Sequence, residues 1–169
     1  TQHVERKHHD PLVYVPSGWS LDIYGKIVRS VVLRVRAKPL TCIANRISSN
    51  PDVQFTIIIN PDNGSGPTAL PDENFLAAVP RLTAYSNALV IGYVRTDKGT
   101  RDISEVKKEI DTYEGWPSAS GNPSFAVHGT FLDEAPSEYD AAAVEYFQQL
   151  ASSIRGSNGL GPNNHVSNC

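Results

Sequence analysis

The chain has 169 residues, of which 40% are hydrophobic and 20% are charged, a composition typical of one globular domain with a sizeable core. Its formal net charge of -3 gives no electrostatic argument for binding nucleic acid or an anionic membrane. Two cysteines, Cys42 and Cys169, are too few for a disulfide framework, and no apolar run approaches the roughly 18 residues that span a bilayer.

Residues 1–10 are polar and charged and form no secretory signal peptide. We expect them to be a solvated tail. The chain begins at Thr1 and contains no methionine, so we expect either a removed leader or a fragment of a longer protein. The missing signal therefore does not decide where the protein works.

Short apolar runs, rich in β-branched residues, alternate with amphipathic stretches along the chain. Nearly continuous apolar runs such as Phe55–Asn60 are typical of strands that are covered on both faces. The runs predict strands at 12–15, 55–60, 89–94 and 125–132, and the beginning of a fifth at 164–167.

Most of the segments between these predicted strands have apolar residues at helical spacing. Asp102 and Glu105 resemble a capping box, Gly156 is expected to end the last helix, and Pro80 is expected to kink or divide the first. The predicted helices cover approximately 72–82, 102–113 and 139–154.

The alternation of strands and helices predicts an α/β fold, a parallel sheet with crossover helices. Two architectures compete: an open doubly wound sheet, as in nucleotide-binding domains, and a closed eight-fold barrel. A barrel needs about 250 residues, or about 200 at the short end. With four strands and the start of a fifth, the pattern alone does not choose between a complete open sheet and an incomplete barrel.

Either architecture binds ligands at the carboxyl ends of its strands. Asp133 and Glu134 end an otherwise apolar strand, and glycoside hydrolysis needs two carboxyl groups. Adjacent strand residues point to opposite faces, so the two share a cleft only if the strand ends or twists between them. The competing interpretation is a loop carboxylate that caps a helix beginning near Ser137.

Other strand ends carry polar and aromatic residues. The loop at 60–67 is turn-rich but lacks the spacing of a phosphate-binding loop, which favours the rim of a sugar cleft. Trp19 and Tyr93 are candidate sugar-stacking platforms, whereas Trp116 and His128 are expected to pack in the core. No motif of a serine hydrolase, a zinc protease or a dithiol redox site occurs, and we expect no metal and no organic cofactor.

The same strand ends resemble the spherulin-4 (spherulation-specific) family, which includes fungal α-1,4-galactosaminidases that act on galactosaminogalactan. The matching segments are Pro11–Pro16 with Trp19, Asn50–Phe55 and Ile57–Gly64, Ile91–Val94 with Thr96 and Arg101, Ile110–Asp111 with Tyr113 and Trp116, and Gly129–Pro136. The resemblance implies an incomplete (β/α)8 TIM-type barrel with four to five parallel strands, secretion or a cell-surface location, and an endo-acting glycosidase. It implies Asp133 and Glu134 as catalytic residues and a sugar site lined by Tyr14, Trp19, Asn60, Asn63, Tyr93 and Arg101.

The chain departs from the family pattern in three places. Ser65 stands where the family loop has proline, and Asp97–Gly99 stands where an aromatic commonly precedes the glycine. Residues 25–47 are an expected insertion within the single domain at 11–169, and we hypothesise a retained intron there, the alternative being a genuine surface insertion or extra helix. We expect the C-terminal strands of the barrel to be missing, which would leave this chain poorly soluble or inactive.

The resulting hypothesis is a glycoside hydrolase acting on a galactosamine-containing or related cell-wall polysaccharide. The alternative is a non-catalytic cell-surface or spore-coat protein that binds glycan in the same cleft. The sequence indicates neither the oligomeric state nor the stereochemical course of hydrolysis.

Overall fold

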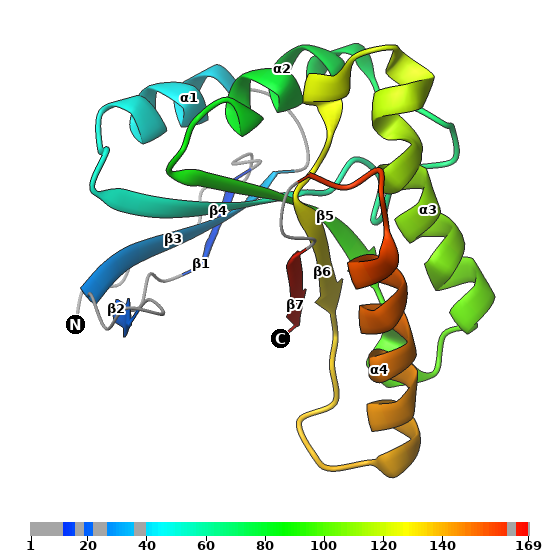
Figure 1. Cartoon of the computed structure of the whole chain (residues 1–169). Coiled ribbons are helices and arrows are strands. Elements are labelled where there is room, and N and C mark those ends of the chain that lie inside the picture. The colour runs from blue at the N-terminus through cyan, green and yellow to red at the C-terminus, as the bar shows by residue number, and fades with distance from the viewer. Residues whose placement is uncertain (1–11, 16–18, 22–26, 36–39, 162–164, 169) are drawn as a thin grey trace.

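A computed structural model describes the backbone of residues 12–15, 19–21, 27–35, 40–161 and 165–168. Side chains are described for residues 43–161. Within these ranges the chain forms one mixed sheet with α-helices against it (Figure 1).

The sheet is mostly parallel. Strands β3 to β7 lie in chain order, and each pairs in parallel with the next, whereas β1 and β2 both pair antiparallel with β3. The bounds are β1 Leu12–Val15, β2 Trp19–Leu21, β3 Ile27–Val35, β4 Val53–Ile59, β5 Ala88–Arg95, β6 Gly129–Asp133 and β7 His165–Asn168. This confirms the α/β class with parallel strands and crossover helices.

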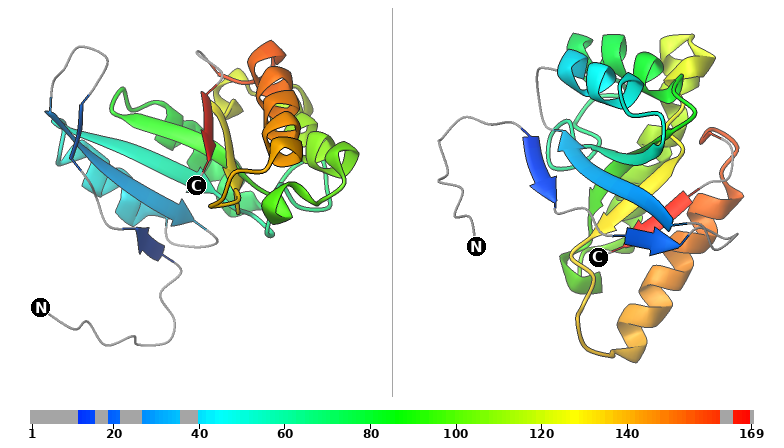
Figure 2. Two further views of the ribbon diagram at one scale, coloured as in Figure 1. Left: turned by 90° about the horizontal axis from the view of Figure 1, so that it is seen from below. Right: turned by 90° about the vertical axis from the view of Figure 1, so that its left-hand side faces the viewer.

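The α-helices of the described part lie on one side of the twisted sheet, as Figures 1 and 2 show. They connect consecutive parallel strands, with α1 before β4, α2 before β5, α3 before β6 and α4 before β7. The bounds are α1 Leu40–Ser48, α2 Glu73–Thr83, α3 Ile103–Ser120 and α4 Ala141–Gly156, with short 3-10 turns η1 at Asp97–Gly99 and η2 at Pro123–Phe125.

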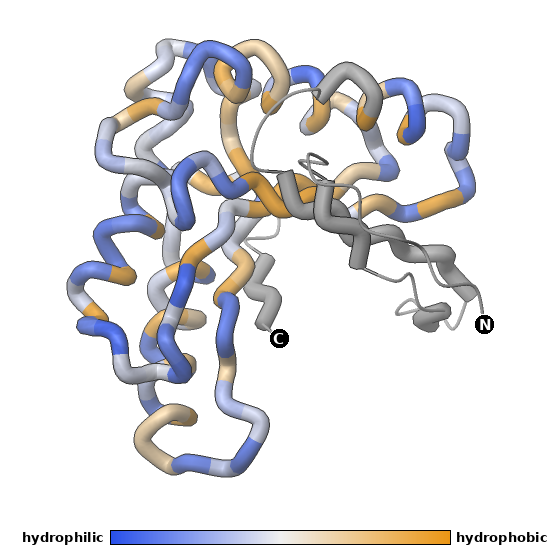
Figure 3. The backbone as a smooth tube through the Cα atoms, turned by 180° about the vertical axis from the view of Figure 1, so that it is seen from behind, coloured by the Kyte–Doolittle hydropathy of each residue, from blue (hydrophilic) through white to orange (hydrophobic). Residues whose placement is uncertain are grey.

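Two apolar clusters lie on opposite faces of the sheet. The larger one joins strand residues to buried residues from all four helices, and at its centre Trp116 stacks on Phe125 with ring centroids 4.8 Å apart. The smaller one contains strand residues only: Ile58, Ile91, Tyr93 and Phe131, with Leu89 packed against them. The hydrophobic colouring of Figure 3 follows the central strands, whereas the loops beyond them are mostly hydrophilic.

The strand predictions differ from the structure in two places. The first predicted strand, β1, is antiparallel to its neighbour, and the parallel series begins instead with β3, which was not predicted and lies within residues 25–47. The predicted strand at 125–132 begins only at Gly129, because Asn122 accepts a hydrogen bond from the Ser124 amide and starts the 3-10 turn. That residues 25–47 are an insertion stays a prediction.

The helix predictions are confirmed with one correction. Helix α2 continues through Pro80 to Thr83 and is not divided. The helix continues although Pro80 has no amide to donate to the Leu76 carbonyl four residues earlier. Asp102 caps α3, as predicted, with its carboxylate accepting from the Ser104 amide at 2.8 Å, and Gly156 ends α4.

Candidate functional site

Three polar residues follow the smaller apolar cluster at the carboxyl ends of β4, β5 and β6. Because side chains alternate along a strand, Asn60 lies on the face of Ile58, and Arg95 on the face of Tyr93. Asp133 follows Phe131 in the same way and pairs in register with Arg95. The helix-free face of the sheet therefore ends in an amide, a guanidinium and a carboxylate on neighbouring strands.

The strand ends between Asp133 and Glu134. β6 ends at Asp133, and Glu134 has φ +65°, a left-handed conformation that is uncommon for a residue with a side chain. This meets the condition under which adjacent carboxylates can leave the strict alternation of a strand. Asp133 is partly buried and Glu134 is exposed.

The backbone of this acidic dipeptide is held by the loop that follows β5. Thr96, fully buried, donates to the Asp133 carbonyl from both its amide (3.2 Å) and its hydroxyl (2.7 Å). The Lys98 amide donates to the Glu134 carbonyl at 2.9 Å. These bonds stabilise the left-handed turn at Glu134 and fix the direction in which both carboxylates leave the backbone.

The dipeptide does not cap the following helix. Helix α4 begins at Ala141, and its N-cap is Asp140, whose carboxylate accepts from the Ala142 amide at 2.9 Å. The interpretation in which Asp133 or Glu134 caps a helix near Ser137 is therefore wrong. The sequence missed Asp140 because several acidic and serine residues in this stretch are equally good caps.

Backbone strain is concentrated in the same loops. In the part of the chain that the structure describes, the non-glycine residues with positive φ are Asn63, Asp97, Lys98 and Glu134. They lie in the loops after β4, β5 and β6, at the carboxyl edge of the sheet. A left-handed conformation at a non-glycine residue lowers the free energy of unfolding by about 1–2 kcal/mol. Such residues cluster at functional sites, where the surrounding structure holds the backbone in an unfavourable conformation.

Arg101 is part of a partly buried polar contact beside these loops. Its guanidinium donates to the Arg95 carbonyl at 3.0 Å and to the carboxylate of Glu109 on α3. The hydrogen bond to Glu109 raises the pKa of Arg101 above its usual value, and burial opposes that shift. Both side chains are 21% exposed.

A tyrosine hydroxyl joins β4 and β5 from the helix side. Tyr113 packs its ring against Gly92, and its hydroxyl lies 3.0 Å from the Tyr93 carbonyl and 3.3 Å from the Ile59 carbonyl. Burial raises the pKa of Tyr113 well above its usual value, with the charge of Glu109 adding to the effect. The tyrosine therefore stays neutral and acts as a structural donor where the two strands end.

The remaining predicted site residues lie as follows. Asn63 is exposed at the tip of the loop after β4. Tyr93 is 2% exposed and stacks on Phe131, with ring centroids 6.3 Å apart, so its ring belongs to the small cluster. The backbones of Tyr14 and Trp19 lie in β1 and β2, but their side chains lie outside the described residues. Trp116 and His128 were expected to pack: Trp116 is fully buried, and His128 accepts from the Val90 amide at 3.0 Å.

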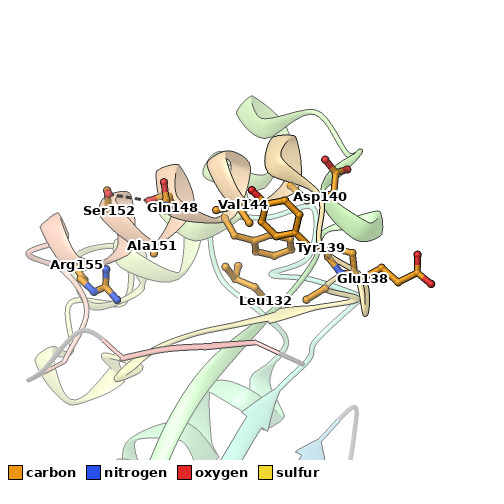
Figure 4. Close-up of a pocket in the computed structure, with 13 residues that line it drawn as sticks. Leu132, Glu138, Tyr139, Asp140, Val144, Gln148, Ala151, Ser152 and Arg155 are labelled. Carbon is orange, nitrogen blue, oxygen red and sulfur yellow. Dashed lines mark hydrogen bonds between the residues drawn. The ribbon is translucent and has the colours of Figure 1, made fainter.

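A groove of about 630 Å³ runs beside α4, close to the acidic dipeptide (Figure 4). Leu132 of β6 lines it from one side and Val144 and Ala151 of α4 from the other, with Tyr139 and Asp140 at one end and Arg155 at the other end. Leu132 belongs to the helix-covered cluster, so the groove opens on the face opposite Phe131. Neither Asp133 nor Glu134 lines it.

The described residues contain no group of three or more histidine, cysteine, aspartate or glutamate side chains that could hold a metal ion. None of the helices in those ranges is both long enough and apolar enough to cross a membrane.

Arg95 is one of the polar strand-end residues that the sequence indicates, two residues beyond Tyr93 and on the same face. Thr96 and Glu109 were not predicted as site residues, because a loop threonine and one helix glutamate among several look the same before the fold brings them to Asp133 and Gly64.

The comparisons with known proteins agree with this architecture. The chain is 44% identical to Sph3 of Aspergillus clavatus, whose crystal structure is a complex with GalNAc; the match has a TM-score of 0.73 and covers 76% of this chain and 51% of that one. It is 33% identical over 107 residues to Spherulin-4 of Physarum polycephalum, covering 63% of this chain and 29% of that protein. A GH6 enzyme of Orpinomyces sp. Y102 shares the fold at 14% identity, with a TM-score of 0.51 and coverage of 78% of this chain and 50% of that one.

The chain therefore spans about half of Sph3 and less than a third of Spherulin-4. The model of the spherulation-specific family 4 (Spherulin4) matches residues 40–168, which is more than half of the chain. With the strand ends and loops described above, this match shows that the protein belongs to the spherulin-4 family.

Proposed function

We propose that this chain is part of a glycoside hydrolase that acts on a galactosamine-containing polysaccharide, with Asp133 and Glu134 as its catalytic residues. The observation that carries the proposal is the end of β6 between the two carboxylates, held by Thr96 and Lys98. The complex of the related Sph3 with GalNAc supports the sugar class.

The chemistry requires one carboxylic acid to protonate the glycosidic oxygen as the bond to the anomeric carbon breaks. A second carboxylate stabilises the positive charge at that carbon, either by bonding to it or by activating the water that adds there. Asp133 and Glu134 supply an acid and its partner, one partly buried and one exposed. Asn60 and Arg95 lie on the face of Asp133 and offer donors to sugar oxygens.

We propose that the sheet belongs to a (β/α)8 barrel. An open doubly wound sheet has helices on both faces, whereas a barrel has helices outside and strand side chains alone inside. The small cluster of Ile58, Ile91, Tyr93 and Phe131 contains no helix residue, which supports the barrel. A crystal structure of the full-length protein with helices on both faces of the sheet would contradict this.

The location is proposed with the function. A polysaccharide of the cell wall is reached from outside the cell, so we propose a secreted or cell-surface protein. Detection of the protein in washed cell walls or culture medium, and not in the cell lysate, tests this.

Hydrolysis is tested in the full-length protein by measuring the reducing ends released from a galactosamine polysaccharide. Asp133→Asn and Glu134→Gln should each lower the rate by about 10²–10⁴-fold, the range typical of a lost general acid or base. Glu138→Gln is the matched control, because Glu138 is an exposed carboxylate of the same loop.

Full hydrolysis by both Asp133→Asn and Glu134→Gln would contradict the proposed catalytic pair. If the unmodified full-length protein binds the polysaccharide but releases no reducing ends, the glycan-binding alternative replaces the hydrolase.

A further inference from the structure

The side-chain amide of Asn60 has a hydrogen-bonded oxygen and a nitrogen without a partner among the described residues. It is fully buried directly after β4, and its Oδ1 accepts from the Gly64 amide at 3.0 Å, which closes the turn that begins the loop. Its Nδ2 is buried and has no hydrogen-bond partner among the described residues. A buried amide nitrogen without a partner is costly, and Asn60 lies on the face of Asp133.

The Glu109 carboxylate lies close against Gly64. A methyl group at Gly64 would lie 2.9 Å from Cδ of Glu109 and would overlap its carboxylate, so no other residue fits there without displacing that side chain. The Glu109 carboxylate is thus packed beside the glycine whose amide donates to Asn60.

Glu109 is in turn fixed by Arg101. One Arg101 nitrogen contacts Glu109 Oε1, and the other donates to the Arg95 carbonyl at the end of β5. Glu109 Oε2 is buried without a hydrogen-bond partner in the part of the chain described. A carboxylate held in this way keeps its position only while the guanidinium neutralises it.

These contacts form one series from the end of β5 through Arg101, Glu109 and Gly64 to Asn60. We propose that Arg101 and Glu109 are a positioning pair that fixes the loop after β4, so that Asn60 Nδ2 donates a hydrogen bond to an acceptor oxygen of the bound sugar. Arg101 therefore acts through Glu109 and does not itself contact the sugar. The sugar contact of Asn60 rests on the proposed function, whereas the role of the pair in fixing the loop does not.

The loop is tested without ligand by hydrogen exchange at the Gly64 amide. Glu109→Gln removes the charge that Arg101 binds, and Arg101→Lys removes the planar group that reaches both of its partners. Each should speed exchange at Gly64 about tenfold relative to the unmodified chain. Asp111→Asn, an exposed acid on the same helix, is the control and should leave that exchange unchanged.

The ligand is tested with N-acetylgalactosamine by titration calorimetry. Asn60→Ala should weaken its affinity about tenfold, the effect of one lost hydrogen bond, and Glu109→Gln should weaken it similarly. If the pair acts through Asn60, Glu109→Gln adds no further loss in the Asn60→Ala background.

Unchanged exchange at Gly64 in both variants overturns the positioning pair, as does a full, additive loss of affinity in the double variant. Absence of sugar binding by the unmodified full-length protein contradicts the proposed function and the role of Nδ2, whereas the exchange comparison still decides whether the pair fixes the loop.

Discussion

The helix-covered core and the carboxyl-edge loops of this protein differ in their packing and in their backbone strain. The core is apolar and closely packed, with Trp116, Tyr113 and Phe125 buried among residues from every helix. The loops after β4, β5 and β6 contain four strained non-glycine residues and, at Asn60, a buried amide nitrogen without a partner among the described residues. The difference indicates that the core supplies the free energy of folding and that the loops use part of it to hold a polar geometry.

The largest effect should come from the core. Trp116→Ala removes a ring that stacks on Phe125 and meets the edge of Tyr113, and it should lower the free energy of unfolding by about 3–5 kcal/mol. Urea denaturation measures this. Tyr139→Ala, at a side chain 87% exposed, should change it by less than about 0.5 kcal/mol. Similar losses in both variants would refute the assignment of stability to the core.

A smaller loss is expected where the loops meet the strand end. Thr96→Val keeps the shape of a fully buried side chain but removes the hydroxyl that donates to the Asp133 carbonyl. The free energy of unfolding should fall by about 1–2 kcal/mol, and hydrolysis should fall with it because Asp133 and Glu134 are no longer held. Normal hydrolysis in this variant would show that the hydrogen bond from the Thr96 hydroxyl to the Asp133 carbonyl is only structural.

The third change should stabilise the protein. Glu134→Gly relieves a left-handed conformation that glycine adopts freely, and it should raise the free energy of unfolding by about 0.5–1 kcal/mol while abolishing hydrolysis. Glu138→Gly, at a neighbouring residue without positive φ, should be neutral or destabilising. A destabilised Glu134→Gly protein would mean that the Glu134 side chain contributes more than its backbone costs.

The smallest effect concerns acid stability. Hydrogen bonds from the Ser104 hydroxyl and amide lower the pKa of Asp102 below its usual value of 3.8. Because the folded-state pKa is the lower one, the contribution of this cap is fully present above the unfolded pKa and is lost as pH falls through the folded pKa. Asp102→Asn keeps the cap and should flatten the acid side of a melting-temperature profile. An unchanged profile would show that other carboxylates govern it.

Much of the fold follows from local pattern. The strands around Ile57 and Ile91 and the three helices after them are recognisable from sequence because periodicity and capping residues act over a few neighbours. Strand β3 escaped prediction because Arg29, Ser30 and Arg34 interrupt its apolar residues and leave neither a continuous apolar run nor a regular alternation. The antiparallel direction of β1 depends on that missed neighbour, so it could not be predicted either.

The sequence by itself determined the α/β class, the polar strand ends and the position of the acidic dipeptide, because each depends on a short run of residues. Only the tertiary structure decided that the strand ends between Asp133 and Glu134, that Thr96 holds them and that Glu109 reaches Gly64. These contacts join residues about 40 positions apart, and whether such groups meet depends on strand register and helix packing. No local pattern contains that information.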